Sequence, residues 1–307
     1  MKCGEKSRIN DVVVSTITDI DDRKNILHAL SSLWGAKKPD EFPGPQPVSI
    51  ERKHFQDLSN DTYHVGRKTD GDRYAFCAMK FNGVNLTFIV SRNFQVHLVK
   101  TEATKAAYDG TIVDCELIGD TLVMFDCVMA GGSNLKSFPF SERLKACETV
   151  NSFFRTHDPK LITDFTFEVK HFDFLTNMNQ LIDATCKHKS DGYVFIPENK
   201  GIVQGTHSSM FKWKPLLQNT IDFGFQHNKI YLQNSAKLLS INISVDLNNI
   251  ELNDDELTII ECAFVSDKKW KALHIRHDKT HPNGHYTYKK TLVNLTEDIQ
   301  ENEFLNF

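Results

Sequence analysis

The chain has 307 residues, with 36 Lys and Arg against 40 Asp and Glu, a formal net charge of -4, and 40% hydrophobic residues. This composition excludes a disordered or fibrous protein, because it supplies enough apolar side chains for a full core. The slightly acidic balance disfavours a protein coated by nucleic acid or bound to an anionic membrane, although it leaves room for a local basic groove. The length favours about two domains.

No targeting or membrane segment is evident. The first residues, MKCGEKSRINDVVV, contain no apolar core of signal-peptide length, and no stretch approaches the ~18 apolar residues that a membrane span requires. We therefore expect an intracellular protein. The seven cysteines are scattered, mostly within apolar runs, and no CxxC pair occurs. This pattern predicts reduced, buried thiols.

The N-terminal part of the chain contains one clear helix. Residues 20–34 place Ile26, Leu30 and other apolar side chains at helical spacing, and Gly35 follows as a stop signal. Residues 37–50 then contain four of the nine prolines. That segment predicts an ordered loop and excludes a helix or a central strand.

Residues 63–128 change to short β-type runs separated by turns. Asn82-Gly83 lies between two such runs, which is the strongest short-range signal for a hairpin, and Gly119-Asp120 lies between two more. Two hairpins imply antiparallel sheet, so the fold class is α+β and a doubly wound parallel sheet is disfavoured.

The rest of the chain alternates between helix and strand patterns. Residues 141–156 predict a helix with Ser141 as its N-cap, and residues 174–188 predict a second helix. The expected strands are 191–197, 229–234, 237–247, 256–265 and 271–277, with a C-terminal amphipathic helix at 290–305. The short strands after residue 223 suit a small antiparallel barrel.

The segment RKTDGDR at residues 67–73 places Lys68 beside a glycine turn, with Arg73 shortly after it. Such a pattern can bring a nucleophilic amine and a second cation to one phosphate. Taken alone, K-x-D-G is a weak signal, because it arises by chance in about one unrelated chain of this length in twenty. A solvated turn is the alternative interpretation.

Further motifs follow this segment in a fixed order. They are DCEL at 114–117, FD at 125–126, DGYVF at 191–195, KWKP at 212–215 and RHDK at 276–279. The series resembles the covalent nucleotidyltransferase superfamily of mRNA capping guanylyltransferases and polynucleotide ligases. Its signature is K-x-D-G, then D-G-E, then D-G-hydrophobic, then K-x-K. The resemblance covers residues 42–283, most of the chain.

Three segments favour the capping enzymes over the ligases. Residues 42–49 (FPGPQPVS) resemble the F-P-G-x-Q-P-V-S segment of capping guanylyltransferases, and residues 276–283 (RHDKTHPN) resemble their R-x-D-K-x-x-P-N motif. Residues 219–223 (NTIDF) also match that family. The resemblance therefore implies an mRNA guanylyltransferase of the compact stand-alone type, as in large DNA viruses and fungi.

The fold implied by the resemblance is α+β with two domains. We expect an antiparallel-sheet nucleotidyltransferase domain of the ligase type, similar to ATP-grasp, at residues 1–223. A C-terminal OB-fold barrel is expected at residues 224–290, and the last helix, residues 291–307, is expected to join the first domain.

Two positions depart from the family pattern. Cys115 replaces the usual glycine of the D-G-E motif, while the carboxylate of Glu116 is retained. A small residue is tolerated in a strand, so we expect activity to remain. Asp72 stands beside Arg73 and adds a negative charge near the expected phosphate site.

The resemblance also implies a reaction in two steps. The neutral amine of Lys68 attacks the α-phosphorus of GTP and expels pyrophosphate, and the diphosphate end of RNA then takes GMP from the lysyl-GMP adduct. A lysine with the ordinary pKa of about 10.4 is almost wholly protonated at neutral pH, so the amine needs nearby cations that favour its neutral form. Arg73, Lys212, Lys214 and a divalent cation, Mg²⁺ or Mn²⁺, are expected to supply that charge.

The resemblance assigns the site residues to three groups. The expected catalytic residues are Lys68, Arg73, Lys212, Lys214, Arg276 and Lys279. The expected nucleotide-binding residues are Thr69, Asp70, Gly71, Arg92, Glu116, Phe125, Lys170, Asp191, Gly192, Val194, Asp222 and Asp278. The expected metal ligands are Glu116 and Asp191, because these divalent cations prefer hard oxygen ligands.

Within this set, Phe125 and Val194 are expected to hold the guanine base between them, and Lys170 is expected to donate to guanine O6. A donor at that point distinguishes guanine from adenine, whose 6-position is itself a donor. Glu116 and Arg73 are expected to contact the ribose.

Several of these residues have a structural alternative. Phe125 could be ordinary core, and Lys212 and Lys214 could lie on an exposed strand face. Asp114 is expected to point away from the site or into solvent and is given no role. Four histidines suggest zinc, but their spacing fits no closed site, so a solvated, partly basic surface that helps to orient RNA is the preferred interpretation. They are His274, His277, His281 and His285.

The alternatives to the guanylyltransferase function are an ATP-dependent polynucleotide ligase and a catalytically silent RNA-binding relative. The expected partners are GTP, the 5′-diphosphate end of RNA, and separate RNA triphosphatase and cap methyltransferase proteins, because the chain has no room for those domains. No membrane partner is expected. The expected location is the nucleus for a cellular protein, and the nucleus or cytoplasm for a viral one.

Overall fold

The structure is a computed structural model that describes residues 4–38, 41–101, 103–154, 165–253, 255–266, 268–277 and 279–307. The chain forms two compact units. Unit 1 comprises Met1–Val48 and Asp57–Lys212, and unit 2 comprises Ser49–Gln56 and Trp213–Phe307. Each unit has its own sheets and its own apolar core.

This division differs from the boundary after residue 223 that the motifs suggested. The segment Ser49–Gln56 belongs to unit 2, where Arg52 contacts Glu297 and Glu303 near the C-terminus through distances of 2.7 Å and 2.6 Å. Lys290 also pairs with Glu51 at 2.6 Å. These contacts attach Ser49–Gln56 to the C-terminal segment. The C-terminal helix groups with unit 2 because its Tyr288, Leu292 and Leu295 side chains pack against the core of that unit.

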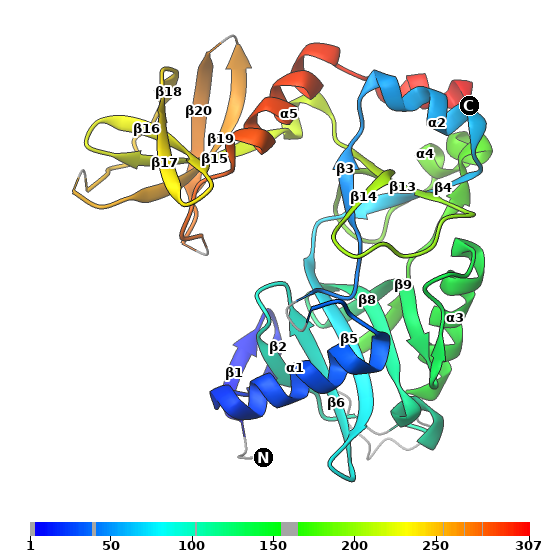
Figure 1. The fold of residues 1–307 in the computed structure, drawn as a ribbon. Helices are drawn as coiled ribbons and strands as arrows, with labels where there is room; N and C mark the ends of the chain where they lie inside the picture. The colour runs from blue at the N-terminus through cyan, green and yellow to red at the C-terminus, as the bar shows by residue number, and fades with distance from the viewer. Residues whose placement is uncertain are drawn as a thin grey trace. The chain divides into compact units, whose positions relative to one another are not determined.

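Unit 1 contains a nine-stranded sheet in the order β1-β2-β7-β6-β5-β8-β9-β10, with β11 pairing in parallel with β9. Figure 1 labels β1, β2, β5, β6, β8 and β9 among these strands. The other strand pairs of this sheet are antiparallel. Its strands are β1 (Glu5–Ile9), β2 (Val12–Thr16), β5 (Asp72–Phe81), β6 (Val84–Ser91), β7 (Val96–Leu98), β8 (Thr111–Ile118), β9 (Thr121–Ala130), β10 (Ser133–Asn134) and β11 (Thr166–Val169).

Both faces of this sheet are buried at β5, whose successive side chains belong alternately to two core clusters. Phe76 and Ala78 contribute to one core cluster, which includes side chains of α3 (Phe140–Phe153). Ala75 and Cys77 contribute to the other cluster, which includes side chains of α1 (Ile20–Trp34). Successive side chains of a strand point to opposite faces, so the two helices cover opposite faces of the sheet.

The predicted helix at residues 20–34 is confirmed, including its ends. Asp19 caps the N-terminus by accepting hydrogen bonds from the backbone N–H groups of Asp21 and Asp22. Gly35 ends the helix with a φ of 67°, a left-handed conformation that glycine adopts readily. Both predicted hairpins are also present, as β5–β6 around Asn82-Gly83 and β8–β9 around Gly119-Asp120.

Two helix predictions need correction. Helix α3 starts at Phe140, with Pro139 as its N-cap, whereas Ser141 lies inside the first turn and donates its hydroxyl to Glu198. The helix expected at residues 174–188 is only α4 (Met178–Asp183), preceded by the short 3-10 turn η3 (Leu175–Asn177). The Arg67 guanidinium binds the carbonyls of residues 181, 182 and 184, which fixes the end of α4.

The second sheet of unit 1 has five strands in the order β12-β4-β13-β14-β3. They are β3 (Gln46–Ser49), β4 (Tyr63–Thr69), β12 (Asp173–Phe174), β13 (Ser190–Pro197) and β14 (Thr206–Trp213). The proline-rich segment supplies β3 at the end of this order, which fits the rule that proline occurs in edge strands.

Unit 2 is a six-stranded antiparallel sheet with one parallel pair, in the order β17-β16-β15-β19-β20-β18. Strands β17 and β18 stand at opposite ends of this order but follow each other in the chain, separated only by residues 242–243. The sheet therefore curls back on itself, as expected of an OB-type barrel. Its strands are β15 (Thr220–Gln226), β16 (Lys229–Asn234), β17 (Lys237–Ile241), β18 (Ser244–Asp246), β19 (Thr258–Ser266) and β20 (Lys269–Ile275).

The predicted C-terminal helix is split in two. Helix α5 (His285–Glu297) ends at Asp298, whose φ of 41° is left-handed, and the 3-10 turn η5 (Glu301–Asn306) follows. The other short elements are η1 (Arg52–His54), α2 (Phe55–Asn60), η2 (Lys105–Asp109) and η4 (Leu216–Gln218). No helix among the described residues is long and apolar enough to cross a membrane.

The cysteine prediction is confirmed for the described residues of the apolar runs. Cys77, Cys115, Cys127, Cys147 and Cys262 are free and buried, whereas Cys186 is free and exposed.

Candidate active site

A cavity of about 210 Å³ lies between the two sheets of unit 1. The nine-stranded sheet contributes side chains from β5, β8 and β9, and the five-stranded sheet contributes side chains from β4, β13 and β14. The residues that line it are Pro45, Pro47, Lys68, Arg73, Arg92, Glu116, Phe125, Asp126, Lys170, Phe172, Val194, Ile196, Met210 and Lys212. Five of these are basic and two are acidic, so the cavity favours an anion.

Lys68, near the end of β4, is held by a carboxylate on the neighbouring strand. Its Nζ lies 2.7 Å from Asp191 Oδ1, and both side chains are partly exposed. The pairing of β4 with β13 shifts register between Ser190 and Tyr193, so β13 has an extra residue there. Gly192 takes up this bulge with a φ of 143°, which only glycine adopts readily. The bulge lies opposite Lys68, next to Asp191.

Three side chains form a buried hydrogen-bonded group beside Lys68. The Thr69 hydroxyl donates to the Glu116 carboxylate, and Lys170 Nζ donates to Thr69 Oγ1 at 2.9 Å and to Glu116 Oε2 at 3.3 Å. Burial lowers the pKa of Lys170, and the positive charge of Lys68 adds to that effect, against the opposing charge of Glu116. Burial therefore makes the charged form of Lys170 less favourable, and a further hydrogen-bond acceptor in the cavity would stabilise that form.

Arg73 of β5 is enclosed by an ion pair and two aromatic rings. Its Nε donates to Asp114 Oδ1 at 2.8 Å, and its Nη2 donates to Asp114 Oδ2 and to the carbonyl of Pro45. The guanidinium carbon lies 5.3 Å from the ring centre of Phe42 and 5.5 Å from that of Phe125. Burial opposes the charge, yet the Asp114 carboxylate raises the pKa of Arg73, so the guanidinium stays ionised. Burial also raises the pKa of Asp114, and the positive charge of Arg73 opposes that rise.

The expectation that Asp114 points away from the site is therefore wrong. Its side chain is 1% exposed and bound to Arg73. Asp114 and Glu116 are two positions apart on β8, and such residues share a face of the strand. Glu116 pairs directly with Arg73 across the sheet, which places Asp114 diagonally beside the same arginine.

The proline-rich segment covers this ion pair at close range. A Cβ atom added to Gly44 would lie 2.0 Å from Asp114 Oδ2 and 2.6 Å from Arg73 Nη2. Only glycine lets the backbone approach the pair so closely. The segment from Phe42 to Pro47 thus contributes a ring, a carbonyl and a close backbone contact to the position of Arg73.

Phe125 and Val194 lie on opposite sheets and both line the cavity, as expected for a pair that holds a planar base. The Phe125 ring also lies 5.5 Å from Lys170 Nζ. Phe125 is not an ordinary core phenylalanine, because its side chain is only half-buried and faces the cavity.

The family of the chain follows from its match to two family models. The model described as "mRNA capping enzyme, catalytic domain" matches residues 9–216, and the model described as "mRNA capping enzyme, C-terminal domain" matches residues 225–305. The chain belongs to the mRNA capping enzyme family.

Individual members of the capping enzyme family are distant in sequence. The mRNA-capping enzyme subunit alpha of Schizosaccharomyces pombe is 24% identical over 369 residues, covering 99% of this chain and 89% of that protein. The mRNA-capping enzyme of Danio rerio is 25% identical over 301 residues, covering 87% of this chain and 49% of that protein. A structure from a study of Lig E DNA ligases matches with a TM-score of 0.39 and 14% identity, covering 76% of this chain and 99% of that chain.

The capping-enzyme motifs of unit 2 converge on one another. Arg276 Nη1 donates to Asp222 Oδ1 at 3.1 Å and to Glu261 Oε2 at 3.4 Å. Asn283 accepts from the Asp222 backbone N–H at 2.9 Å and donates its own backbone N–H to the Asp222 carbonyl at 2.7 Å. The NTIDF and RHDKTHPN segments therefore form one polar cluster in unit 2. Asp278, an expected nucleotide ligand, lies outside the described residues.

The structure thus brings together part of the expected capping site. In unit 1 the cavity gathers Lys68, Arg73, Arg92, Glu116, Phe125, Lys170, Val194 and Lys212. Asp70 and Gly71 lie exposed between β4 and β5, where Asp70 is 3.4 Å from Lys189 Nζ, and Asp72 is exposed as well. Lys214, Asp222, Arg276 and Lys279 belong to unit 2.

The sequence assigned no role to Asp126 of the FD motif or to its partner Arg143, which lies behind the cavity lining. Asp126 lines the cavity, and Arg143 of α3 binds it through two hydrogen bonds of 2.8 Å and 3.1 Å. A signal for Arg143 exists in the sequence, because it precedes Cys147 and Val150 by four and seven positions and so lies on the apolar stripe of its helix. A charged side chain on such a stripe requires a buried partner.

Proposed function

We propose that the protein is an mRNA guanylyltransferase that takes GMP from GTP onto Lys68 and passes it to the 5′-diphosphate end of RNA. The observation that carries the proposal is the position of Lys68 in a cation-lined cavity that also presents Phe125 and Val194. An amine nucleophile, charges for a triphosphate and two surfaces for a base are the parts that this reaction needs.

In the first step the Lys68 amine attacks the α-phosphorus of GTP. A nitrogen–phosphorus bond forms, the bond from that phosphorus to the bridging oxygen breaks, and pyrophosphate leaves with the bonding electrons. The amine proton needs an acceptor, and Asp191 Oδ1, 2.7 Å from Lys68 Nζ, is close enough to receive it. Arg73, Arg92 and Lys212 supply positive charge for the phosphoryl oxygens.

In the second step an oxygen of the RNA diphosphate attacks the same phosphorus. The new phosphorus–oxygen bond replaces the nitrogen–phosphorus bond, and the Lys68 amine returns to its starting state. The product carries the 5′-5′ triphosphate linkage of an mRNA cap.

Base selection is assigned to Lys170, with Thr69 and Glu116 orienting it. Lys170 is 8% exposed and lines the cavity beside Phe125. A guanine O6 would give its ammonium the additional acceptor that burial makes favourable, whereas the amino group of adenine would place a donor against a donor. This arrangement favours GTP over ATP and so disfavours a ligase.

The acidic residues of the cavity region fit a divalent cation of the Mg²⁺ or Mn²⁺ type. No group of three or more His, Cys, Asp or Glu side chains could hold a metal within the described part of the chain. Such cations need only one or two carboxylates when substrate phosphates complete the shell, and Asp191 and Glu116 supply hard oxygens of this kind. When bound, the cation would offset the negative charge of the triphosphate.

The remaining assignments stay predictions. Catalytic roles for Lys214, Arg276 and Lys279, and nucleotide contacts for Asp70, Gly71, Gly192, Asp222 and Asp278, follow from the family motifs. Separate triphosphatase and methyltransferase proteins are expected to supply the other steps of capping. The nuclear or cytoplasmic location is likewise a prediction.

Incubation of the protein with α-labelled GTP and Mg²⁺ or Mn²⁺ tests the proposal. We expect a covalent GMP adduct on wild type, none on Lys68→Ala, and normal adduct on Lys80→Ala, which removes an exposed lysine of β5. An adduct formed from ATP and not from GTP would indicate a ligase. The absence of an adduct with either nucleotide would contradict the proposal and favour the silent RNA-binding relative.

A further inference from the structure

Two consecutive residues of β9, Phe125 and Asp126, both line the cavity. A regular strand cannot do this, because neighbouring side chains point to opposite faces. The pairing of β8 with β9 shows how the rule is broken. Asp114 lies opposite Asp126 and Cys115 lies opposite Met124, so Phe125 is an extra residue without a partner on β8.

This extra residue forms a β-bulge, and the core pattern follows it. Met124 and Cys127 both belong to the core cluster on the α3 side of the sheet, with Phe125 and Asp126 between them. Bulges turn a side chain toward a new direction and occur beside active sites. Here the bulge turns Phe125 toward the cavity while Asp126 points to the same side.

The Asp126 carboxylate holds the bulge in place. Its Oδ1 accepts from the backbone N–H of Cys127 at 2.8 Å, immediately after the bulge. The same oxygen accepts from Arg143 Nε at 2.8 Å, and Oδ2 accepts from Arg143 Nη2 at 3.1 Å. The bidentate geometry fixes both the position and the plane of the carboxylate.

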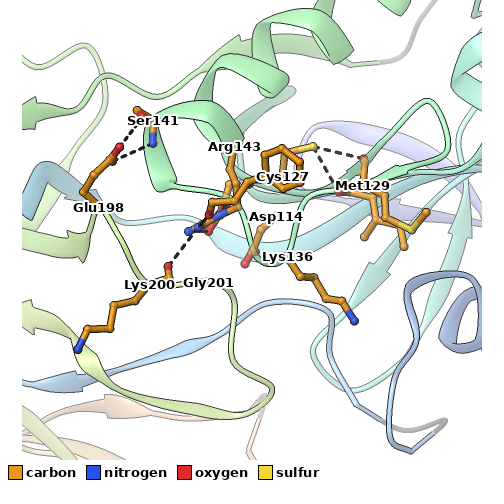
Figure 2. Close-up of polar contacts among 12 residues, drawn as sticks. Asp114, Cys127, Met129, Lys136, Ser141, Arg143, Glu198, Lys200 and Gly201 are labelled. Atoms are coloured by element: carbon orange, nitrogen blue, oxygen red, sulfur yellow. Dashed lines mark hydrogen bonds and ion pairs between the residues drawn. The ribbon is translucent and has the colours of Figure 1, made fainter.

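Arg143 is itself held rigidly from the other side. Its side chain is 1% exposed, and its Nη1 donates to the carbonyls of Phe138 at 2.7 Å and Lys200 at 3.2 Å. Glu198 binds the start of the same helix through the Ser141 backbone and hydroxyl, as Figure 2 shows together with the contact to Lys200. Arg143 therefore connects the bulge of β9 to α3 and to the loop after β13.

We propose that Arg143 is a positioning residue for guanine, acting through Asp126 and the β9 bulge to hold the Phe125 ring against the base. This inference deepens the proposed guanylyltransferase function and rests on it. Arg143 does not line the cavity and touches no substrate in this role. Arg143 differs from an arginine that only stabilises the fold in the position of its carboxylate partner, because Asp126 directly follows Phe125.

The variant Arg143→Lys tests the proposal, because it keeps the charge and loses the fork that binds both carboxylate oxygens. If a contact with the base is equally strong in the bound substrate and in the transition state, its loss raises KM without lowering kcat. We expect KM for GTP in adduct formation to increase about tenfold, with kcat changed less than about twofold. Pyrophosphate, which discharges the adduct and has no base, should keep its KM.

A double-mutant cycle separates positioning from general destabilisation. Phe125→Leu alone should raise KM for GTP by a similar factor, and Phe125→Leu combined with Arg143→Lys should raise it no further, because both remove one interaction. Asp126→Asn, which keeps one oxygen acceptor for Arg143, provides a second variant that should show the same pattern. Lys145→Ala, an exposed change on the same helix, is the matched control.

The outcomes are distinct. An unchanged KM for GTP in Arg143→Lys and Asp126→Asn, multiplicative effects in the double variant, or an equal rise in KM for pyrophosphate would overturn the positioning role while leaving the guanylyltransferase proposal intact. A wild-type protein that forms no GMP adduct would overturn the proposed function and the positioning role together.

Discussion

The two ends of the cavity in unit 1 hold their charged groups in different ways. At the Lys68 end, the lysine is 22% exposed and its partner Asp191 is 13% exposed. At the Phe125 end, Arg73 is 15% exposed but its partner Asp114 is only 1% exposed, and Arg143 and Asp126 are 1% and 2% exposed. Both partners of the Lys68 pair are accessible, whereas each pair at the Phe125 end has at least one partner sealed beneath the surface.

This difference corresponds to the work proposed for each end. The amine of Lys68 must lose a proton and form a bond to phosphorus, so its ion pair with Asp191 must open. Partial exposure makes this opening easier. A stacking surface must not move, and buried, fully hydrogen-bonded pairs are rigid. The accessible end is suited to chemistry, and the sealed end is suited to orientation.

The largest expected difference between the two ends is the loss of stability when one acidic side chain is removed from each. Asp126→Ala leaves the buried charge of Arg143 without its carboxylate, and we expect the free energy of unfolding to fall by about 3–5 kcal/mol. Asp191→Ala disrupts a partly exposed pair and should cost about 1 kcal/mol. Urea unfolding of the two variants and wild type, followed by circular dichroism, measures both values. Equal losses would show that the two ends do not differ in rigidity.

Much of the fold was accessible from the sequence because it depends on local signals. The helix at residues 20–34 has a cap at each end, and the two hairpins carry glycine turns between β-rich runs. By contrast, α4 is shorter than its pattern because a distant guanidinium, that of Arg67, binds its last carbonyls. The attachment of Ser49–Gln56 to the C-terminus is also a long-range contact that no local pattern encodes.

The candidate site shows the same limit. The family resemblance placed Lys68, Glu116, Phe125 and Lys170 in one site, and the cavity contains all four. The role of Asp114 was missed because it depends on the register that pairs Glu116 of β8 with Arg73 of β5, and residue spacing within one strand does not give the register with its neighbour.

A smaller effect is expected where the proline-rich segment closes over the Arg73–Asp114 pair. Gly44→Ala would place a Cβ 2.0 Å from Asp114 Oδ2, so either the segment or the ion pair must shift. We expect a loss of about 1–3 kcal/mol in the free energy of unfolding, as for other overpacked sites. KM for GTP should rise as well, because Arg73 also contacts Phe125.

Gly284→Ala is the matched control for this change. Its added Cβ would have no atom nearer than 3.9 Å, so no clash arises, and only the preference of the α5 N-cap for glycine over alanine remains, at about 0.5–1 kcal/mol. Thermal unfolding and adduct kinetics on both variants give the comparison. A Gly44→Ala protein that behaves like Gly284→Ala would mean that the segment does not constrain the sealed end.

The smallest effect expected is a pH dependence of stability that comes from Lys170, between the two ends. Burial lowers the pKa of Lys170 in the folded protein, whereas an unfolded lysine keeps a pKa of about 10.4. Between these two values the unfolded chain binds more protons than the folded one, so stability from this residue rises with pH. We expect the free energy of unfolding of wild type, relative to Lys170→Met, to increase from pH 7 to pH 9.5. The same difference taken against Lys145→Met, an exposed site, should stay flat. A difference that falls with pH would show that Glu116 outweighs burial and holds the Lys170 ammonium as firmly as the sealed pairs are held.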